Sequence, residues 1–184
     1  MTTAAAAWVA LVGLVLVVAR AQGTGTFSYV TTAPLTTDLK FWGAAAVGEK
    51  VVFAPYHAPE VGVFDTTTNK FSTPATTGSV TATYKFSGAA AVNNKVVFAP
   101  SGADVVGVFD PATSTFSTPA TTGSLTSMSD KFSGAAAVGT KVVFAPYDAD
   151  DVGVFDTATN TFSLPATTGS LITDAKFRGA AAVG

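Results

Sequence analysis

The apolar residues of this chain fall into short runs that return at regular intervals. In one stretch a small-residue run at Gly134–Val138 precedes a β-branched and aromatic run at Lys141–Ala145, a third run at Val152–Phe155 and a fourth that opens at Thr161–Ser163. Residues that favour turns separate these runs, which is typical of short β-strands. The stretch therefore predicts four strands.

The composition of two of these runs sharpens the prediction. The run Gly134–Val138 is rich in Ala but only five residues long, too short for a helix to nucleate. Val142, Val143 and Phe144 show no polar alternation, which favours a strand that is covered on both faces. Sheets of this kind must stack on one another.

The pattern repeats along the chain. Units start with a Lys-Phe pair at Lys40, Lys85, Lys131 and Lys176, so the spacing is 45 or 46 residues, and a fixed period of this size indicates a repeat architecture. Four short antiparallel strands, with small residues in the first, are the pattern of a β-propeller blade, whose innermost strand lines a crowded axis.

We therefore predict an all-β fold, a β-propeller of about 45-residue, four-stranded blades. The predicted blades cover residues 40–84, 85–130 and 131–175, with an outer strand of a partial blade in 22–39 and a truncated inner strand in 176–184. The two partial pieces predict either a fragment of a longer repeat protein or a short chain that assembles from several copies. Each arrangement leaves blade faces bare, so we expect self-association.

The residues between the third and fourth strands predict a tight hairpin. Asp156 and Asn160 bracket one such turn, where Asp accepts backbone N–H bonds and Asn tolerates a left-handed conformation. Asp65 with Asn69, and Asp110 with Ser114, occupy the same places in the other units. These aspartates are interpreted as turn residues rather than catalytic ones.

The units resemble kelch-type and the related YVTN-type propeller repeats. Val154–Thr161 matches the segment V-x-D-x-x-T-N-T, and Gly134–Val138 with Lys141–Phe144 resembles the first two kelch strands. The similarity covers residues 27–184, with Ala145-Pro146 and its equivalents where kelch units carry a double glycine. The resemblance implies a binding module, because propeller proteins of these kinds are mostly non-catalytic.

The amino terminus carries a targeting pattern. An unbroken apolar run at Ala4–Ala19 is followed by Ala19-Arg20-Ala21, which matches the apolar core and A-x-A cleavage site of a secretory signal peptide. We expect this run to be helical and residues 1–21 to be removed, so that the mature, secreted protein begins at Gln22. The alternative is a retained membrane anchor at residues 4–19.

Composition excludes several classes of function. The formal net charge is −2 without a run of Lys or Arg, so nucleic acid is not an expected partner. Cysteine is absent, which removes disulfides, thiolate metal sites and cysteine nucleophiles. No cofactor-binding motif is present, and we expect no cofactor.

Candidate binding residues come from the positions at which the units differ. The loops after the second strand vary while the strands are nearly identical, and Trp42, Ser87, Ser133 and Arg178 share one position just ahead of the inner strand, near the axial opening. In a propeller these loops and the linkers between blades share one face. The candidate residues of that face are Trp42, Tyr56, His57, Glu60, Ser101, Asp104, Tyr147, Asp148, Asp150, Asp151 and Arg178.

Two of these groups suggest more specific chemistry. Asp148, Asp150 and Asp151 could supply oxygen ligands to Ca²⁺, although they lack the Gly and distal Glu of a calcium loop, and a solvated acidic loop is the alternative. His57 is the sole histidine, so a catalytic triad would have to use it. We expect protein or glycan binding without catalysis; the alternatives are a structural surface-layer or wall repeat, and a propeller-type lyase or oxidase.

Overall fold

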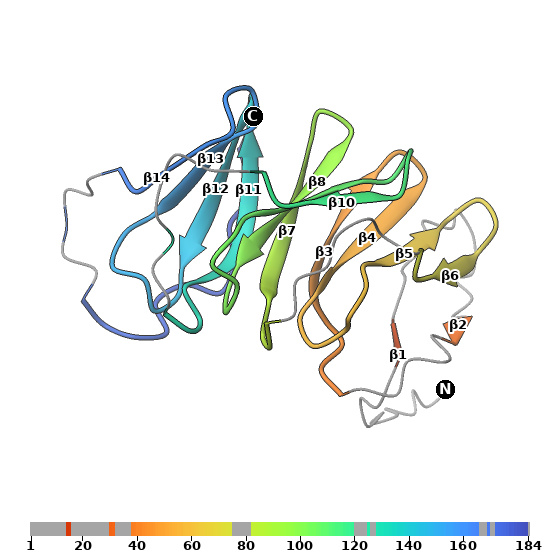
Figure 1. Ribbon diagram of the computed structural model, residues 1–184, viewed down its shortest axis with the longest axis horizontal. Coiled ribbons are helices and arrows are strands. Elements are labelled where there is room, and N and C mark those ends of the chain that lie inside the picture. Colours follow the sequence, from red (N-terminus) through yellow and green to blue (C-terminus); the bar gives the residue numbers. More distant parts are fainter. Residues whose placement is uncertain are drawn as a thin grey trace, which may run out of the picture.

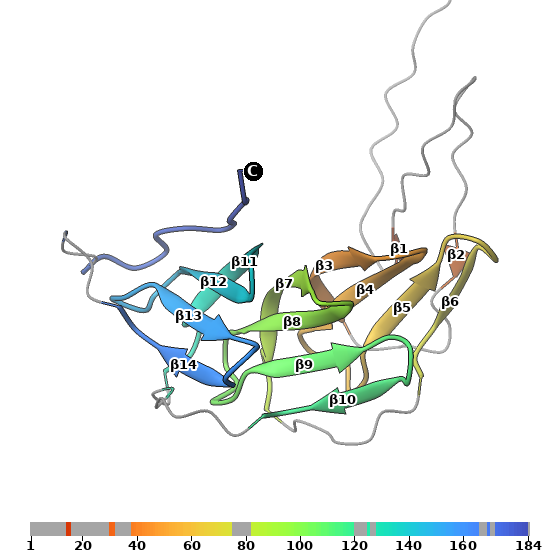
Figure 2. The ribbon, with the colours of Figure 1, turned by 90° about the horizontal axis from the view of Figure 1, so that it is seen from above.

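The computed structural model describes residues 38–74, 82–119, 125, 128–165, 169 and 172–183, together with the short strands at 14–15 and 30–31. Three four-stranded antiparallel sheets stand side by side in an open arc (Figure 1). Figure 2 shows the inner strands toward the open side of the arc and the outer strands at its periphery. The described part of the chain is therefore a partial β-propeller, as the repeat predicts.

Each sheet is one blade whose strand order follows the chain. The first blade comprises β3 (Phe41–Val47), β4 (Lys50–Pro55), β5 (Gly62–Asp65) and β6 (Lys70–Ser72). The second comprises β7 (Phe86–Val92), β8 (Lys95–Pro100), β9 (Gly107–Asp110) and β10 (Thr115–Ser117). The third comprises β11 (Phe132–Val138), β12 (Lys141–Pro146), β13 (Gly153–Asp156) and β14 (Thr161–Ser163).

The amino-terminal region adds a separate strand pair. β1 (Leu14–Val15) pairs antiparallel with β2 (Val30–Thr31), and β2 lies beside β6. At Leu14–Val15 the structure has a strand where the leader was expected to be helical. The rest of the run at 4–19 falls outside the described residues, and the leader stays a prediction. Among the residues that the structure does describe, no helix has the length and apolar character needed to cross a membrane.

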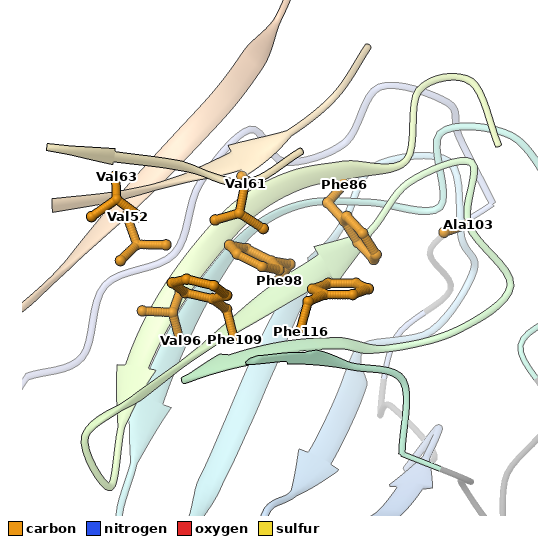
Figure 3. Close-up of a cluster of buried hydrophobic side chains, with 10 residues drawn as sticks. Val52, Val61, Val63, Phe86, Val96, Phe98, Ala103, Phe109 and Phe116 are labelled. Carbon is orange, nitrogen blue, oxygen red and sulfur yellow. The ribbon is translucent and has the colours of Figure 1, made fainter. Parts of the chain in front are cut away.

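The two faces of a blade differ in composition, and this difference builds the core. In the second blade Phe86, Phe98, Phe109 and Phe116 point to one face, which packs on Val52, Val63 and other aliphatic residues of the first blade (Figure 3). The opposite face of the second blade carries Val92 and Val97, which pack on the aromatic face of the third blade. Each junction thus joins an aromatic face to an aliphatic one.

A glycine in each inner strand allows neighbouring blades to approach closely. Gly43, Gly88 and Gly134 lie where the pairing register shifts between the first two strands of each blade, and all three have a positive φ between 94° and 112°. A Cβ atom on Gly88 would lie 2.5 Å from the Cα of Gly134, and one on Gly43 would lie 2.7 Å from the Cα of Gly88. Since non-bonded carbons need about 3.5 Å, only glycine fits at these positions.

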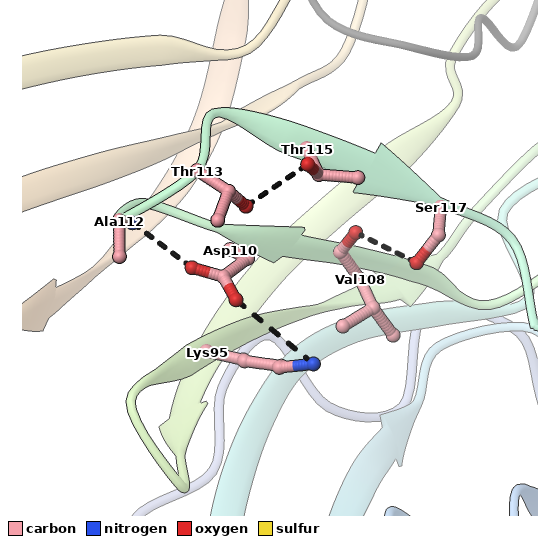
Figure 4. A network of polar contacts seen from close by, with 7 residues as sticks. All are labelled: Lys95, Val108, Asp110, Ala112, Thr113, Thr115 and Ser117. Atoms are coloured by element: carbon pink, nitrogen blue, oxygen red, sulfur yellow. Dashed lines mark hydrogen bonds and ion pairs between the residues drawn. The ribbon is translucent and has the colours of Figure 1, made fainter.

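The turn between third and fourth strands has the predicted form. Asp110 Oδ1 accepts a hydrogen bond from the backbone N–H of Ala112 at 2.9 Å, and the other carboxylate oxygen lies 4.0 Å from Lys95 Nζ (Figure 4). Asp65 and Asp156 accept the equivalent backbone bonds. The residues that close these turns, Asn69, Ser114 and Asn160, have φ values of 54° to 55°. The interpretation of the aspartates as turn residues is confirmed.

The carboxyl-terminal segment continues the arc beyond the third blade. Lys176 N donates to Tyr147 O at 3.0 Å, just as Lys85 N donates to Tyr56 O at 3.0 Å one blade earlier. A Cβ on Gly134 would lie 2.6 Å from the Cα of Gly179. Residues 176–183 therefore occupy the place of a fourth inner strand (Figure 2).

Candidate functional site

The starts of the four inner segments converge on one cavity at the axis of the arc. Trp42, Ser87, Ser133 and Arg178 contribute one side chain from each segment, and the Gly-Ala pairs that follow them complete the lining. The cavity has a volume of about 320 Å³. The sequence position that differs from unit to unit thus surrounds the axial opening.

The floor of this axial cavity is backbone and small side chains. The Cβ-free glycines hold neighbouring strands so close that little but main chain and Ala faces the axis. Ser87 Oγ and Ser133 Oγ lie 3.1 Å apart and share a buried hydrogen bond. The polar groups of the floor are therefore paired with each other and not with a base.

An aromatic cluster lies beside the cavity and reaches its lining through Trp42. Trp42 lies 5.2 Å from Tyr56, Tyr56 stacks on His57 at 5.1 Å, and Tyr84 lies 5.2 Å from Tyr56 and 4.7 Å from His57, measured between ring centroids. Trp42 and Tyr84 keep 42% and 44% of their surfaces exposed. These four residues, which we call the aromatic rim, present a continuous apolar edge to solvent.

A cation and an aromatic ring form a second group on the cavity edge. Arg178 Nη2 donates to Tyr147 Oη at 2.6 Å, and the guanidinium carbon lies 4.8 Å from the centre of the same ring. This combined hydrogen bond and cation–π contact holds the guanidinium beside the cavity. Its remaining N–H groups can donate to an acceptor on a ligand.

The linkers between blades position the rim. The carbonyls of Leu39, Tyr84 and Asp130 each accept a bond from the loop that follows the second strand of the next sheet, as in Gly102 N to Tyr84 O at 2.7 Å. All three residues adopt a left-handed φ between 49° and 55°. For a large aromatic side chain such as Tyr84 this conformation is uncommon and costs about 1–2 kcal/mol.

The electrostatics of the site involve a small set of groups. Burial raises the pKa of the Tyr56 hydroxyl, and the nearby charge of Asp130 adds to this effect, followed by Tyr84 and Tyr147. Ser101 Oγ donates to Asp130 Oδ1 at 3.1 Å. Tyr56 therefore stays protonated at neutral pH and can serve as a hydrogen-bond donor.

One candidate residue, Asp104, forms an ion pair between two blades. Asp104 Oδ1 lies 3.1 Å from Nζ of Lys131, whose side chain is almost fully buried at the start of the third blade. Lys131 Nζ also donates to Met128 O at 2.6 Å. We assign Asp104 to this contact between the second and third blades.

The acidic candidates do not gather into a metal site. Asp148 Oδ1 accepts from Ala175 N at 2.9 Å and so holds the linker that follows the third blade. In the described part of the chain, no group of three or more His, Asp or Glu side chains is placed to hold a metal ion. Asp148, Asp150 and Asp151 therefore do not converge on a Ca²⁺ ion, and Glu60 joins no such group either.

Sequence reasoning overlooked one rim residue. Tyr84 occupies the linker position held by Leu39, Asp130 and Ala175 in the other units. Because the residue at that position differs from unit to unit, the sequence could have indicated Tyr84 as a candidate binding residue in the same way that it indicated Trp42. The proximity of Tyr84 to His57, in contrast, depends on how the linker packs on the loop of the preceding blade.

Comparisons with known proteins support the fold alone. No protein-family model matches the sequence, and a comparison with curated proteins finds no match. Among solved structures, the chain is similar to hydrazine synthase of Kuenenia stuttgartiensis, with 18% identity, a TM-score of 0.54, and coverage of 83% of this chain and 42% of that one.

Two further structures show the same likeness. The computationally designed Ika4 protein matches with 16% identity and a TM-score of 0.54, and the match covers 82% of each chain. U3-55K matches with 14% identity and a TM-score of 0.50 over 80% of this chain and 40% of its own. The chain thus spans about two fifths of hydrazine synthase and of U3-55K. At these identities the likeness concerns the propeller architecture and no activity.

Proposed function

We propose that this chain is a non-catalytic binding module that takes a protein or glycan ligand on the axial face of its blades. The observation that carries the proposal is the exposure of Trp42 and Tyr84 beside an axial cavity that Arg178 flanks. Exposed aromatic rings offer a large contact area at a small cost in conformational entropy, and they dominate many interfaces. Arg178, which lines the same cavity, can donate hydrogen bonds to carboxylate or carbonyl oxygens of a ligand.

The polar groups of the cavity support binding rather than catalysis. Ser87 and Ser133 bond to each other, whereas a serine nucleophile needs a base within hydrogen-bond reach. His57 stacks flat on Tyr56, and its buried Nε2 has no hydrogen-bond partner. Neither arrangement supplies the nucleophile and base that a hydrolytic site requires.

The proposal is tested by screening the purified chain against a glycan array and a phage-displayed peptide library. The strongest hit is then measured by calorimetry with Trp42→Ala, Tyr84→Ala and, as a control, Leu164→Ala, whose side chain is 43% exposed but lies after the outer strand of the third blade. We expect about a thirtyfold loss of affinity for each rim variant, typical of an interface hot spot, and none for the control. Equal affinities in all three variants would exclude the aromatic rim as the binding surface.

We also propose that the module is secreted. The supporting pattern is the apolar run Ala4–Ala19 followed by Ala19-Arg20-Ala21. Amino-terminal sequencing of protein recovered from the medium should begin at Gln22. Recovery of Met1 or Thr2 from a membrane fraction would instead support the anchor.

A structural role in a surface layer is a second candidate function. The exposed aliphatic face of the third blade favours it, because Val138 is 61% exposed where its counterpart Val92 is 7% exposed. In such a layer, many copies of the chain would assemble side by side and each would keep its axial face exposed.

A further inference from the structure

The two junctions inside the chain show what covers each kind of blade face. At both, an aromatic face lies on the aliphatic face of the preceding blade, and the Phe side chains of the second and third blades are almost completely buried. Polar bonds lie at the edge of the same junctions: Lys50 Nζ donates to Pro111 O at 2.8 Å, and Asn93 Nδ2 donates to Thr157 Oγ1 at 3.3 Å. The apolar part of the interface is thus built twice from the same positions, whereas the polar bonds at its edge differ between the two junctions.

The two ends of the arc carry the unmatched halves of this interface. Phe41, Phe53 and Phe71 of the first blade are only half-buried, although their counterparts in the other blades are buried. At the other end Val138 is 61% exposed and Val143 is half-buried, whereas Val92 and Val97 are buried at the equivalent positions. The aromatic face at the first-blade end is therefore partly open, since Phe64 on that face is only 3% exposed, and the aliphatic face at the other end is open.

We propose that these open faces bind each other between two copies of the chain. The aliphatic face of the third blade in one copy takes the aromatic face of the first blade in a second copy. Copies then join head to tail. Because the contact is heterologous, repetition gives a closed ring if the rotation closes, and a filament if it does not.

The carboxyl-terminal segment is exchanged in this contact. Residues 176–183, KFRGAAAV, differ from residues 40–47, KFWGAAAV, at one position, so β3 of the second copy fits the place that the segment occupies. The segment supplies only an inner strand and leaves Val138 bare, whereas the second copy brings β4, β5 and β6 as well. The larger apolar burial favours the exchange.

The exchange also changes the axial cavity. In the single chain, Arg178 lines the cavity next to Ser133. After the exchange, Trp42 of the second copy takes the place of Arg178, because the two residues occupy the same position in the repeat. The assembled cavity is therefore lined by residues of both copies. This proposal stands on the blade faces and does not depend on which ligand the cavity binds.

Analytical ultracentrifugation of the purified chain over a hundredfold range of concentration tests the association. We expect the wild type to associate, and both Val138→Lys and Phe71→Glu to remain monomeric on their own. Ile172→Lys is the control, since Ile172 is 79% exposed in the linker that follows the third blade and belongs to no blade strand. It should associate like the wild type.

Mixing the two face variants separates head-to-tail contact from pairing of like faces. The Val138→Lys chain keeps its aromatic face and the Phe71→Glu chain keeps its aliphatic face, so an equimolar mixture should give a one-to-one dimer and nothing larger. A dimer in either variant alone would mean that like faces pair, and this result would overturn the proposal.

Cross-linking provides a second test that leaves both faces intact. The chain has no cysteine, and Gly139 and Thr66 are the counterparts of Asn93 and Thr157, which touch across the second junction. A chain with Gly139→Cys and Thr66→Cys should form ladders of covalent oligomers with a short bis-maleimide. The control chain with Asn93→Cys and Thr157→Cys should cross-link within one molecule.

Two results would contradict the proposal outright. One is a wild-type chain that stays monomeric across the whole concentration range. The other is a Gly139→Cys, Thr66→Cys chain that gives no intermolecular product while the control chain cross-links internally.

Discussion

Asp65, Asp110 and Asp156 close the hairpins at the outer edge of the blades through their own carboxylates. In each, Oδ1 accepts a bond from the backbone N–H two residues further on, at 2.9 Å. In Asp65 a further bond from Thr68 N is the main reason that the carboxyl pKa lies below its usual value, since bonds to the ionised form favour it. The negative charge of the carboxylate therefore strengthens the backbone hydrogen bonds that hold the turn.

Substitution of one of these aspartates should affect stability and leave binding unchanged. Asp156→Ala removes the bond to Ala158 N and should lower the free energy of unfolding by about 1 kcal/mol, the usual contribution of one hydrogen bond. Asp156→Asn keeps an acceptor oxygen and serves as the control. Urea unfolding measures both. A loss of ligand affinity in Asp156→Ala without any loss of stability would show that the residue belongs to the binding site.

The turn residues could be predicted from the sequence because their geometry is local. Asp and Asn specify the turn with bonds that reach only two or three residues. Tyr84 could not be placed in the same way, because its contacts with Tyr56 and His57 join the linker after the first blade to a loop much earlier in the chain, and only the packed structure brings the two together.

At the scale of the strand, the close contact between inner strands fixes the arc. Gly88 lies between Gly43 and Gly134 and touches both through backbone atoms. The Ala-rich composition of these strands predicts a crowded axis. The register shift and the positive φ of the glycines were not predictable, since they depend on how far neighbouring strands approach.

The glycine contact predicts a large difference between two glycine substitutions. Gly88→Ala would place a Cβ 2.5 Å from the Cα of Gly134 at a φ of 112°, and should destabilise the fold by at least about 3 kcal/mol through overpacking and backbone strain. Gly139→Ala is the control, because its Cβ would meet no atom within 4 Å and only the φ of 59° is unfavourable. We expect about 1–2 kcal/mol there. Equal losses in thermal unfolding would contradict the contact.

A buried lysine at the start of the second blade predicts a pH dependence. Burial lowers the pKa of Lys85 from its ordinary value of 10.5. Between the lowered pKa and 10.5 the unfolded chain holds the proton and the folded chain releases it, so the free energy of unfolding should rise with pH in this window. The contribution is complete above 10.5 and is lost as the pH falls through the folded pKa.

Lys85→Met should abolish that rise. Urea unfolding between pH 8 and pH 10.5 measures the slope in both proteins. The comparison with the next blade explains why Lys85 is the residue to change: Lys131 has Asp104 beside it, whereas the sequence carries Pro59 at the position equivalent to Asp104. An unchanged slope in Lys85→Met would assign the pH dependence to another group.

For the whole molecule, the repeat period predicts the blade number and the arc, because each unit carries one complete sheet and the period is visible in the sequence. The pairing of unlike faces was not predictable. It follows from the alternation of Phe on one side and Val or Ala on the other only once the strand register is known. That pairing determines what each open end can bind.

Because assembly and folding are linked, the thermal stability of this chain should depend on its concentration. A contact that exists only between folded copies raises the melting temperature as the protein concentration rises. We expect wild-type chain and Ile172→Lys to gain several degrees in melting temperature between about 1 µM and 100 µM, since about 1 kcal/mol shifts Tm by about 2–4 °C in a domain of this size.

Val138→Lys and Phe71→Glu should melt at a temperature that is independent of concentration. An equimolar mixture of these two variants should regain part of the dependence, because one intact junction is restored. A sharp melt at a constant temperature for the wild type, together with a monomeric mass, would mean that the open faces stay bare in solution.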